Sequence, residues 1–140
     1  MTYLPEELPA PQPGIDDAPY WQGCSRKELL VQRCAACGEF RHPPSPACPH
    51  CKSFEREWFA SRGEGKVYTF TWVSHAPHPA LKGYTPYNVV LVELDDAPGV
   101  RIVSNAVNAT AANLEIGTPV SIAWEELGNG VVLPRFRVAG

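Results

Sequence analysis

From Gly63 onward, apolar and polar residues follow a period of two, which is typical of β-strands. The segments that fit a strand pattern are residues 66–73, 87–94, 101–107, 120–124 and 132–138. In the first of them the alternation predicts Tyr68, Phe70 and Trp72 on one face and valine and threonine on the other. The second is nearly all apolar, as expected of a central strand. The pattern therefore predicts a sheet of five strands.

A short helical turn at residues 111–114, stopped by the Gly-Thr-Pro sequence at 117–119, separates the third predicted strand from the fourth. Five strands with a helical turn in that place match the small Greek-key barrel called the OB-fold. Gly63 and Gly65 stand where the first strand of such a barrel must bend or bulge. We therefore expect an all-β fold in which residues 61–140 form a five-stranded OB-fold barrel.

The N-terminal stretch has a different character. Residues 1–19 contain five prolines, which favour an extended arm that is either disordered or laid along a partner. A short helix is predicted to begin near Pro19. Tyr20 and Trp21 are large for an exposed tail, so they are expected to pack on the body of the protein or on another subunit. Residues 1–28 are predicted to form this arm and helix.

Two Cys-x-x-Cys pairs stand ten residues apart, Cys34 with Cys37 and Cys48 with Cys51. Thiolates are soft ligands that suit zinc, and four of them close a tetrahedral structural site with no open position. Strand-like sequence before the first pair and after it predicts a hairpin with the first pair at its tip. The spacing therefore predicts a zinc ribbon at residues 29–60 that binds structural Zn²⁺ through these four cysteines and folds around it.

Three other uses of these cysteines are open. Two disulfides are disfavoured because the chain has five cysteines and no pattern of a secretory signal. The sequence from Cys48 to Cys51 has the form of a dithiol redox motif, but it follows a proline-rich stretch at 43–46 that cannot lead into a helix N-terminus. Iron is the third alternative. The fifth cysteine, Cys24, is predicted to be a packing residue.

The composition and the absence of certain motifs make some classes of function less favoured than others. The net charge of −3 argues against a general nucleic-acid binder. No apolar run approaches the roughly 20 residues that cross a bilayer, so we expect a cytoplasmic protein with no membrane partner. The sequence has no Gly-rich phosphate loop, no nucleophile elbow and no paired carboxylates with distinct roles. Catalysis by this chain alone is therefore not expected.

The longest connection in the predicted barrel, residues 74–86, is a candidate binding loop. Its notable side chains are His75, His78 and Tyr84, and Tyr87 opens the next strand. Long ordered loops on a rigid barrel are common binding sites, and OB-folds use this loop for ligands. A hairpin loop stiffened by proline is the alternative.

A second candidate surface lies on the last predicted strand. Arg135 and Arg137 share one face of that strand, while Phe136 takes the other. Two arginines in this register suit an interface or an anionic ligand. Simple exposure to solvent is the alternative.

Several short motifs together resemble one known family. They are Tyr20-Trp21, Leu29 to Gly38, Arg41 to Pro44, Cys48 to Cys51, Gly63 to Tyr68, His78 to Ala80, Pro86-Tyr87, Leu91 to Leu94, Ile116-Gly117 and Leu133 to Phe136. In this order they are similar to the acyl-CoA-associated zinc-ribbon/OB-fold family, long catalogued as a domain of unknown function. The resemblance covers residues 15–138. Lys52 departs from it, because the second knuckle often has glycine there.

The resemblance implies a non-catalytic accessory subunit that completes a thiolase-like enzyme, either a thiolase or a retro-aldolase acting on acyl-CoA esters of steroid side chains. A hot-dog-fold enoyl-CoA hydratase is the alternative partner. By the same analogy, residues 74–87 face the acyl-CoA entrance of the partner. A module that binds single-stranded nucleic acid through Tyr68, Phe70 and Trp72 is the alternative function.

Overall fold

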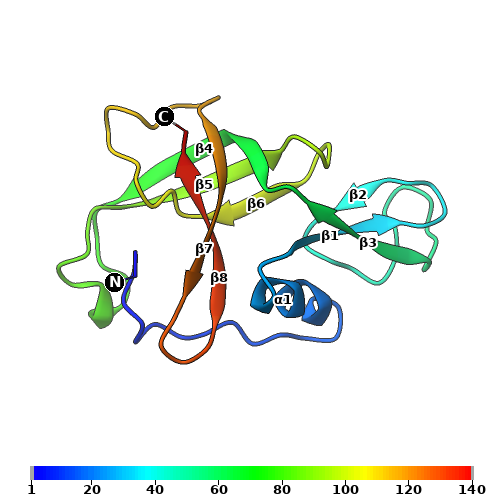
Figure 1. The fold of residues 1–140 in the computed structure, drawn as a ribbon, viewed down its shortest axis with the longest axis horizontal. Coiled ribbons are helices and arrows are strands. Elements are labelled where there is room, and N and C mark those ends of the chain that lie inside the picture. The colour runs from blue at the N-terminus through cyan, green and yellow to red at the C-terminus, as the bar shows by residue number, and fades with distance from the viewer. Residues whose placement is uncertain (1, 140) are drawn as a thin grey trace.

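In the computed structural model, which describes residues 2–139, the chain forms a small three-stranded sheet and a curled five-stranded sheet with one helix beside them (Figure 1). The elements in chain order are α1 (Ala18–Ser25), β1 (Leu29–Cys34), β2 (Phe40–Arg41), β3 (Arg56–Ser61), β4 (Glu64–Val73), the 3₁₀ turn η1 (Pro79–Leu81), β5 (Tyr87–Leu94), β6 (Arg101–Ser104), β7 (Pro119–Glu126) and β8 (Val132–Val138). The mostly β fold predicted from the sequence is confirmed.

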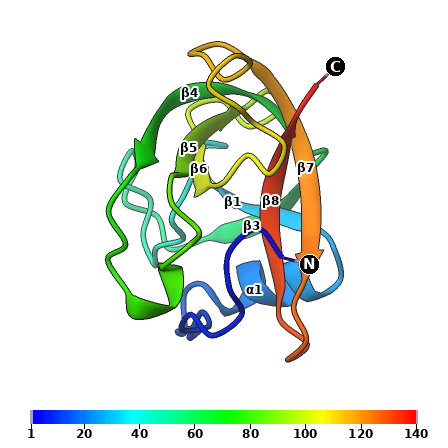
Figure 2. The same ribbon diagram turned by 90° about the vertical axis from the view of Figure 1, so that its left-hand side faces the viewer.

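The five-stranded sheet has the order β6-β5-β4-β7-β8, with every neighbouring pair antiparallel. It curls on itself, as the end-on view in Figure 2 shows, and a parallel bridge between Ala106 and Phe136 brings its two ends together. Phe136 is fully buried, together with Val90, Val92 and Ile102 from the facing strands. The sheet therefore encloses its own core, which is the arrangement of an OB-fold.

Strand β4 departs from strict alternation. Its register against β5 shifts between Val67 and Thr69, so Tyr68 is an extra residue in a bulge. Tyr68 and Thr69 are therefore both exposed, whereas Phe70 and Trp72 pack against the core. The prediction that Tyr68 shares a face with Phe70 and Trp72 was wrong. One inserted residue interrupts the alternation, so residues on its two sides no longer follow a single period of two.

The third barrel strand is shorter than its pattern suggests. Residues 101–107 were predicted as a strand, but β6 ends at Ser104. The buried side chain of Asn88 accepts the backbone N–H of Ala106 at 2.7 Å and donates to its carbonyl at 2.9 Å. Asn105 in turn donates to the carbonyl of Asn88. These side-chain bonds replace the strand ladder and direct the chain toward β8.

The ribbon sheet has the order β2-β1-β3, so β1 is its central strand. Leu29 and Val31 of β1 are buried in one cluster with Tyr20 and Cys24 of α1. Tyr20 therefore packs on the body of the protein, as expected. Cys24 is 1% exposed and fills space in the same cluster, as predicted for the fifth cysteine.

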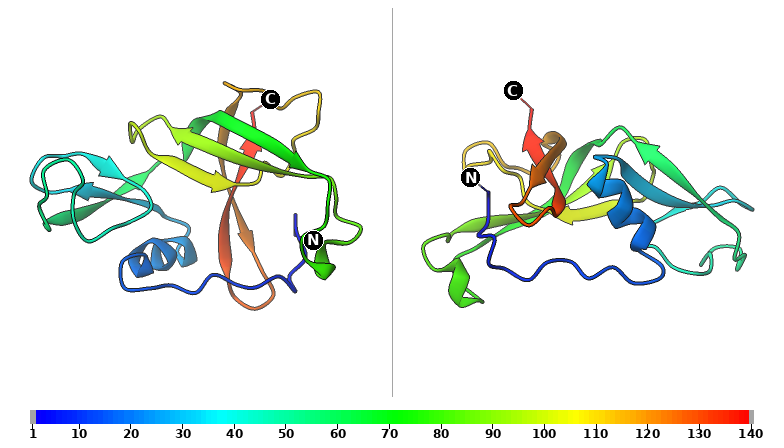
Figure 3. Two further views of the ribbon diagram at one scale, coloured as in Figure 1. Left: turned by 180° about the vertical axis from the view of Figure 1, so that it is seen from behind. Right: turned by 60° about the horizontal axis from the view of Figure 1, so that its bottom comes forward.

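The N-terminal arm lies along its own barrel, which corrects the expectation of disorder or of docking on a partner. Figure 3 shows it passing beneath the β7–β8 hairpin on its way to α1. The backbone N–H of Tyr3 donates to Glu125 at 2.8 Å, and its hydroxyl accepts from the Asn88 side chain at 2.8 Å. Pro5 is buried, and Glu6 accepts the backbone N–H of Gly128. The barrel of the same chain thus supplies the contacts of the arm, which the sequence pattern could not locate.

Among residues 2–139, no helix has the length and apolar character needed to cross a bilayer.

Candidate metal centre and binding surfaces

Both cysteine pairs sit in turns of the same construction. Cys34 closes β1, and its carbonyl accepts the N–H of Gly38 at 2.9 Å. In the second turn, the carbonyl of Cys48 accepts the N–H of Lys52 at 2.8 Å. In each turn the second cysteine also donates its backbone N–H to the sulfur of the first, at 3.4 Å and 3.5 Å. Two copies of one knuckle therefore face each other.

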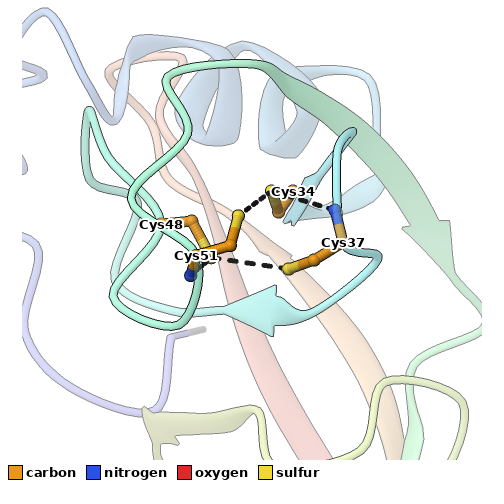
Figure 4. A group of neighbouring side chains, drawn as sticks. All are labelled: Cys34, Cys37, Cys48 and Cys51. Atoms are coloured by element: carbon orange, nitrogen blue, oxygen red, sulfur yellow. Dashed lines mark hydrogen bonds between the residues drawn. The ribbon is translucent and has the colours of Figure 1, made fainter.

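The four sulfurs converge on one point (Figure 4). All four Sγ atoms lie within 4.8 Å of one another, and the pairs Cys34–Cys51 and Cys37–Cys48 are 3.6 Å and 3.7 Å apart. A tetrahedral zinc with Zn–S bonds of about 2.3 Å requires sulfurs separated by about 3.8 Å. The donor set and its spacing therefore fit zinc, which would be held by the four thiolates in a closed structural site. The predicted structural Zn²⁺ site is confirmed.

Backbone amides prepare two of the thiols for metal binding. The N–H of Cys37 lowers the pKa of the Cys34 thiol, and the N–H of Cys51 lowers that of the Cys48 thiol. An N–H donor stabilises a thiolate more than a thiol, and the thiolate is the form that binds metal. Each knuckle therefore favours the ionised form of its first cysteine through its own backbone, whereas the pKa values of Cys37 and Cys51 are raised.

Lys52 occupies a left-handed backbone conformation with φ of 69°, where the matching residue of the first knuckle is Gly38 at φ 83°. A side chain in this conformation costs roughly 1 kcal/mol, which glycine avoids. We expect Lys52→Gly to raise the free energy of unfolding of the ribbon by about 0.5–1 kcal/mol with zinc bound. Urea denaturation followed by Trp58 fluorescence measures this. Glu55→Gly, an exposed position outside the knuckle, is the control and should not stabilise.

The residues proposed for the long loop are spread along it. His75 and Tyr84 are exposed, and Tyr84 retains 46% of its accessible surface. His78 is also exposed, but its Nδ1 accepts the N–H of Ala80 at 3.1 Å, so that nitrogen caps η1. Tyr87 opens β5 and is half-buried. The loop thus presents His75 and Tyr84 to solvent, while His78 has a structural bond.

The two arginines of β8 differ in environment. Arg135 is half-buried, with its Nε 3.2 Å from Glu125 and an Nη1 donor on Asn105. Arg137 lies opposite Ser121 of β7 and is exposed. Arg135 therefore belongs to a polar network beneath the N-terminal arm. Of the two arginines of β8, Arg137 is the one that presents its guanidinium to solvent.

A cavity of about 350 Å³ lies where α1, the ribbon and the barrel meet. Its wall includes Tyr20 and Trp21 of α1, His42 and Pro43 after β2, and Leu133 of β8. The sequence analysis missed this site because the segments that build it are up to about a hundred residues apart. No local motif joins them, and only the docking of α1 between the two sheets brings them together.

The curled barrel and the four-thiolate cluster together define the class of zinc-ribbon/OB-fold proteins. Two family models match: "ChsH2, rubredoxin-like zinc ribbon domain" over residues 21–56 and "ChsH2, C-terminal OB-fold domain" over residues 58–125. A solved chain described as "Ltp2-ChsH2(DUF35) aldolase" superposes with a TM-score of 0.83 at 40% identity, covering 94% of this chain and 100% of that one.

Curated relatives carry two kinds of name. A "Probable enoyl-CoA hydratase alpha subunit" of Thermomonospora curvata is 43% identical over 92% of this chain and 40% of the relative. The "3-oxo-4,17-pregnadiene-20-carboxyl-CoA hydratase alpha subunit" of Mycobacterium tuberculosis is 38% identical over 86% and 37%. A "DUF35 domain-containing scaffold protein" of Methanocaldococcus jannaschii is 30% identical over 76% and 75%.

The chain belongs to the DUF35 family, which includes the ChsH2 zinc-ribbon and OB-fold domains. It spans about two fifths of the length of the two hydratase subunits that it matches, and about three quarters of the archaeal scaffold protein. The family predicted from the sequence motifs is therefore confirmed.

Proposed function

We propose that this chain is a non-catalytic accessory subunit that binds a thiolase-like acyl-CoA enzyme, with a retro-aldolase as the favoured partner. The observation that supports this most strongly is the match to the solved "Ltp2-ChsH2(DUF35) aldolase" chain. That match covers the whole of the other chain at 40% identity, so both the ribbon and the barrel are alike. The steroid-derived acyl group named in the mycobacterial relative supports a bulky acyl-CoA ester as the substrate of the complex.

The site chemistry supports an accessory role. A zinc held by four thiolates has no position left for water or substrate, so it stabilises the fold rather than activating a nucleophile. The exposed histidine His75 lies on the long loop, and the described residues place neither a cysteine nor a serine in hydrogen-bond contact with it. The reacting groups are therefore expected in the partner.

The surface proposed to face the partner is the loop of residues 74–86 together with the start of β5. Tyr84 is 46% exposed there, and His75 and His78 are exposed on the same loop. Exposed aromatic side chains on an ordered loop are frequent anchors at protein interfaces. Tyr87 and Arg137 are proposed to contact the partner as well. Arg135 is proposed to act indirectly, through its bonds to Glu125 and Asn105.

A hot-dog-fold enoyl-CoA hydratase is the second partner candidate, favoured by the names of the two bacterial relatives. Those relatives are more than twice as long as the part that this chain matches. The two candidates differ in reaction, since an aldolase cleaves a carbon–carbon bond and a hydratase adds water.

Co-expression tests the proposal. The chain should elute from size exclusion as one complex with a thiolase-like aldolase, and the complex should cleave a 3-hydroxyacyl-CoA that neither chain cleaves alone. Tyr84→Ala should weaken the complex by about tenfold or more, as is usual for a central aromatic anchor. Ile116→Ala removes an apolar side chain that is 71% exposed on another connection and is the matched control.

Two separately eluting proteins, or full lyase activity of the partner alone, would contradict the proposal. Water addition to an enoyl-CoA by a complex with a hot-dog-fold protein would favour the second candidate instead.

A further inference from the structure

Strand β6 forms one end of the five-stranded sheet. Among the strands of residues 2–139 it pairs with β5 and with no other. In Figure 1 it is the lowest of the strands β4, β5 and β6, and α1 lies below it. All four of its residues, Arg101 to Ser104, line the cavity between α1, the ribbon and the barrel. One wall of this cavity is therefore the edge of a β-strand.

The pairing with β5 determines which backbone groups of β6 face the cavity. In an antiparallel ladder, hydrogen-bonded pairs of residues alternate with pairs that share no hydrogen bond. The bond of 3.1 Å from the N–H of Leu94 to the carbonyl of Val100 sets the phase of this alternation. Counting on from that bond, Ile102 is hydrogen-bonded to β5, whereas Arg101 and Val103 point their N–H and carbonyl groups away from it. These outward groups face the cavity.

A proline prevents β8 from pairing with this edge. Further along the chain, the N–H of Phe136 donates to the carbonyl of Asn105 at 3.0 Å, and its carbonyl accepts the N–H of Val107 at 2.8 Å. If this parallel ladder continued, residue 134 would donate to the carbonyl of Val103. Pro134 has no N–H, so the ladder stops there. Within residues 2–139 the outward backbone groups of Val103 therefore have no backbone partner.

The other walls leave room for a single extended segment. They include Trp21 of α1, Pro44 of the loop after β2 and Leu133 of β8. The volume of about 350 Å³ is at the lower end of the range of about 300–1,000 Å³ typical of ligand pockets. Neighbouring strands lie about 4.8 Å apart, so the edge of a second barrel would bring its own β5 against these walls. The cavity therefore suits one strand better than a second copy of this chain.

The charged groups at the cavity indicate which segment fits. The side chain of Arg101 is 43% exposed, stacks on Tyr68 at 3.9 Å and lies 3.5 Å from the half-exposed Glu93. Arg135 is much more buried and has its own ion pair, and the carboxylate of Asp17 accepts a backbone N–H of the arm. Side chains directly opposite on neighbouring strands interact, and opposite charges stabilise the pair. Arg101 therefore complements an acidic residue on an added strand.

We propose that an extended segment of the catalytic partner adds to the free edge of β6 as a further strand, with an apolar side chain in the cavity and an acidic side chain beside Arg101. The inference rests on the proposed function, because the segment belongs to the same partner. It adds a second contact, separate from the loop of residues 74–86. In such strand addition, main-chain hydrogen bonds give affinity and the pockets for alternate side chains give specificity.

Hydrogen exchange of single backbone amides, measured by mass spectrometry with electron-transfer fragmentation, tests this. The samples are the full zinc-loaded chain alone and its complex with a thiolase-like aldolase. In the free chain the amide of Val103 should exchange fast, while that of Ile102 should be protected by its bond to β5. In the complex the Val103 amide should exchange about a hundredfold more slowly or slower still, because it gains a partner.

The outcomes separate this inference from the proposed function. A complex that forms without slowing the Val103 amide would overturn strand addition and leave the proposed function intact. A chain that forms no complex would overturn both. A dimer of the chain alone in analytical ultracentrifugation, with its Val103 amide already protected, would assign the edge to a second copy and overturn the proposal as well.

Val103→Pro tests the backbone bond itself. It removes the outward N–H and no bond to β5, since proline is tolerated on an edge strand where the N–H faces outward. The complex should dissociate about tenfold or more readily than that of the parent chain. Val103→Thr, which keeps both the N–H and the branched shape, is the matched control and should bind as the parent does. Equal affinity of the two variants would refute strand addition.

A charge reversal decides the question if Val103→Pro fails to fold. Arg101→Glu should weaken the complex about tenfold or more, because it places two acidic side chains beside each other. Arg62→Glu makes the same change at a side chain that is 76% exposed between β3 and β4, away from the cavity, and should have little effect. If both reversals leave the affinity unchanged, the proposed acidic segment is wrong.

Discussion

Cys37→Ser is expected to abolish zinc retention and to unfold the ribbon while the barrel stays folded. Structural zinc contributes roughly 10–16 kcal/mol of apparent folding free energy to small cysteine-rich units, and three thiolates with one hydroxyl hold it far less tightly. Cys37 is exposed, so the substitution removes a ligand without leaving a cavity. The core residues around Phe136, such as Val90 and Ile102, come from barrel strands, so the barrel should survive.

Metal analysis and hydrogen exchange by mass spectrometry measure the two parts of this result. Zinc should fall from one per chain to near zero, and residues 29–61 should lose protection while β5 and β8 retain it. Cys24→Ala, at the buried cysteine outside the cluster, should retain zinc. Full zinc content in Cys37→Ser, or equal loss of protection in both sheets, would disprove the assignment.

Phe136→Ala should lower the free energy of unfolding of the barrel by about 3–5 kcal/mol, because it empties the centre of the core. Phe136 is 0% exposed and sits where β8 meets the bridge from Ala106. Its backbone also accepts and donates bonds that join Val107 and Asn105 to β8. The loss should therefore appear as a large shift in the denaturation midpoint followed by Trp72 and Trp124 fluorescence.

Phe54→Ala is the matched control, since it deletes the same atoms from a side chain that is 72% exposed. Its effect should stay within about 0.5 kcal/mol. If the two alanine variants have similar midpoints, the barrel core has been placed wrongly.

The parts of the fold that the sequence predicted well are those with local signals. The paired cysteines at a spacing of two residues define each knuckle. The apolar run of β5 and the alternation in β8 give strands with the predicted bounds. The order of five strands with a turn between the third and fourth was enough to predict an OB-fold. Each knuckle and each single strand is signalled within about ten residues of sequence.

The parts that could not be predicted depend on contacts between distant residues. The bulge at Tyr68 depends on how β4 pairs with β5, and the alternating pattern carries no sign of it. The position of the arm depends on Tyr3 meeting Asn88 and Glu125, which follow it by 85 and 122 residues. One weak signal was present, because Asn88 is one of only two polar residues, with Glu93, in a mostly apolar strand.

The candidate sites also differ in whether a local sequence signal marks them. The four thiolates were identifiable because their ligand type and spacing are local. The cavity at Tyr20 and His42 was not, because three elements contribute to it and none has a motif of its own. His42 stands out only because its Nδ1 atom is buried without a hydrogen-bond partner among the described residues. That burial depends on the fold and has no sequence motif.

Native mass spectrometry of the chain co-expressed with a thiolase-like aldolase tests the central claim most directly. We expect one species whose mass equals whole copies of both proteins, with one zinc for each 15.3 kDa copy of this chain. Two proteins at their separate masses, or a complex in which this chain carries no zinc, would contradict the account.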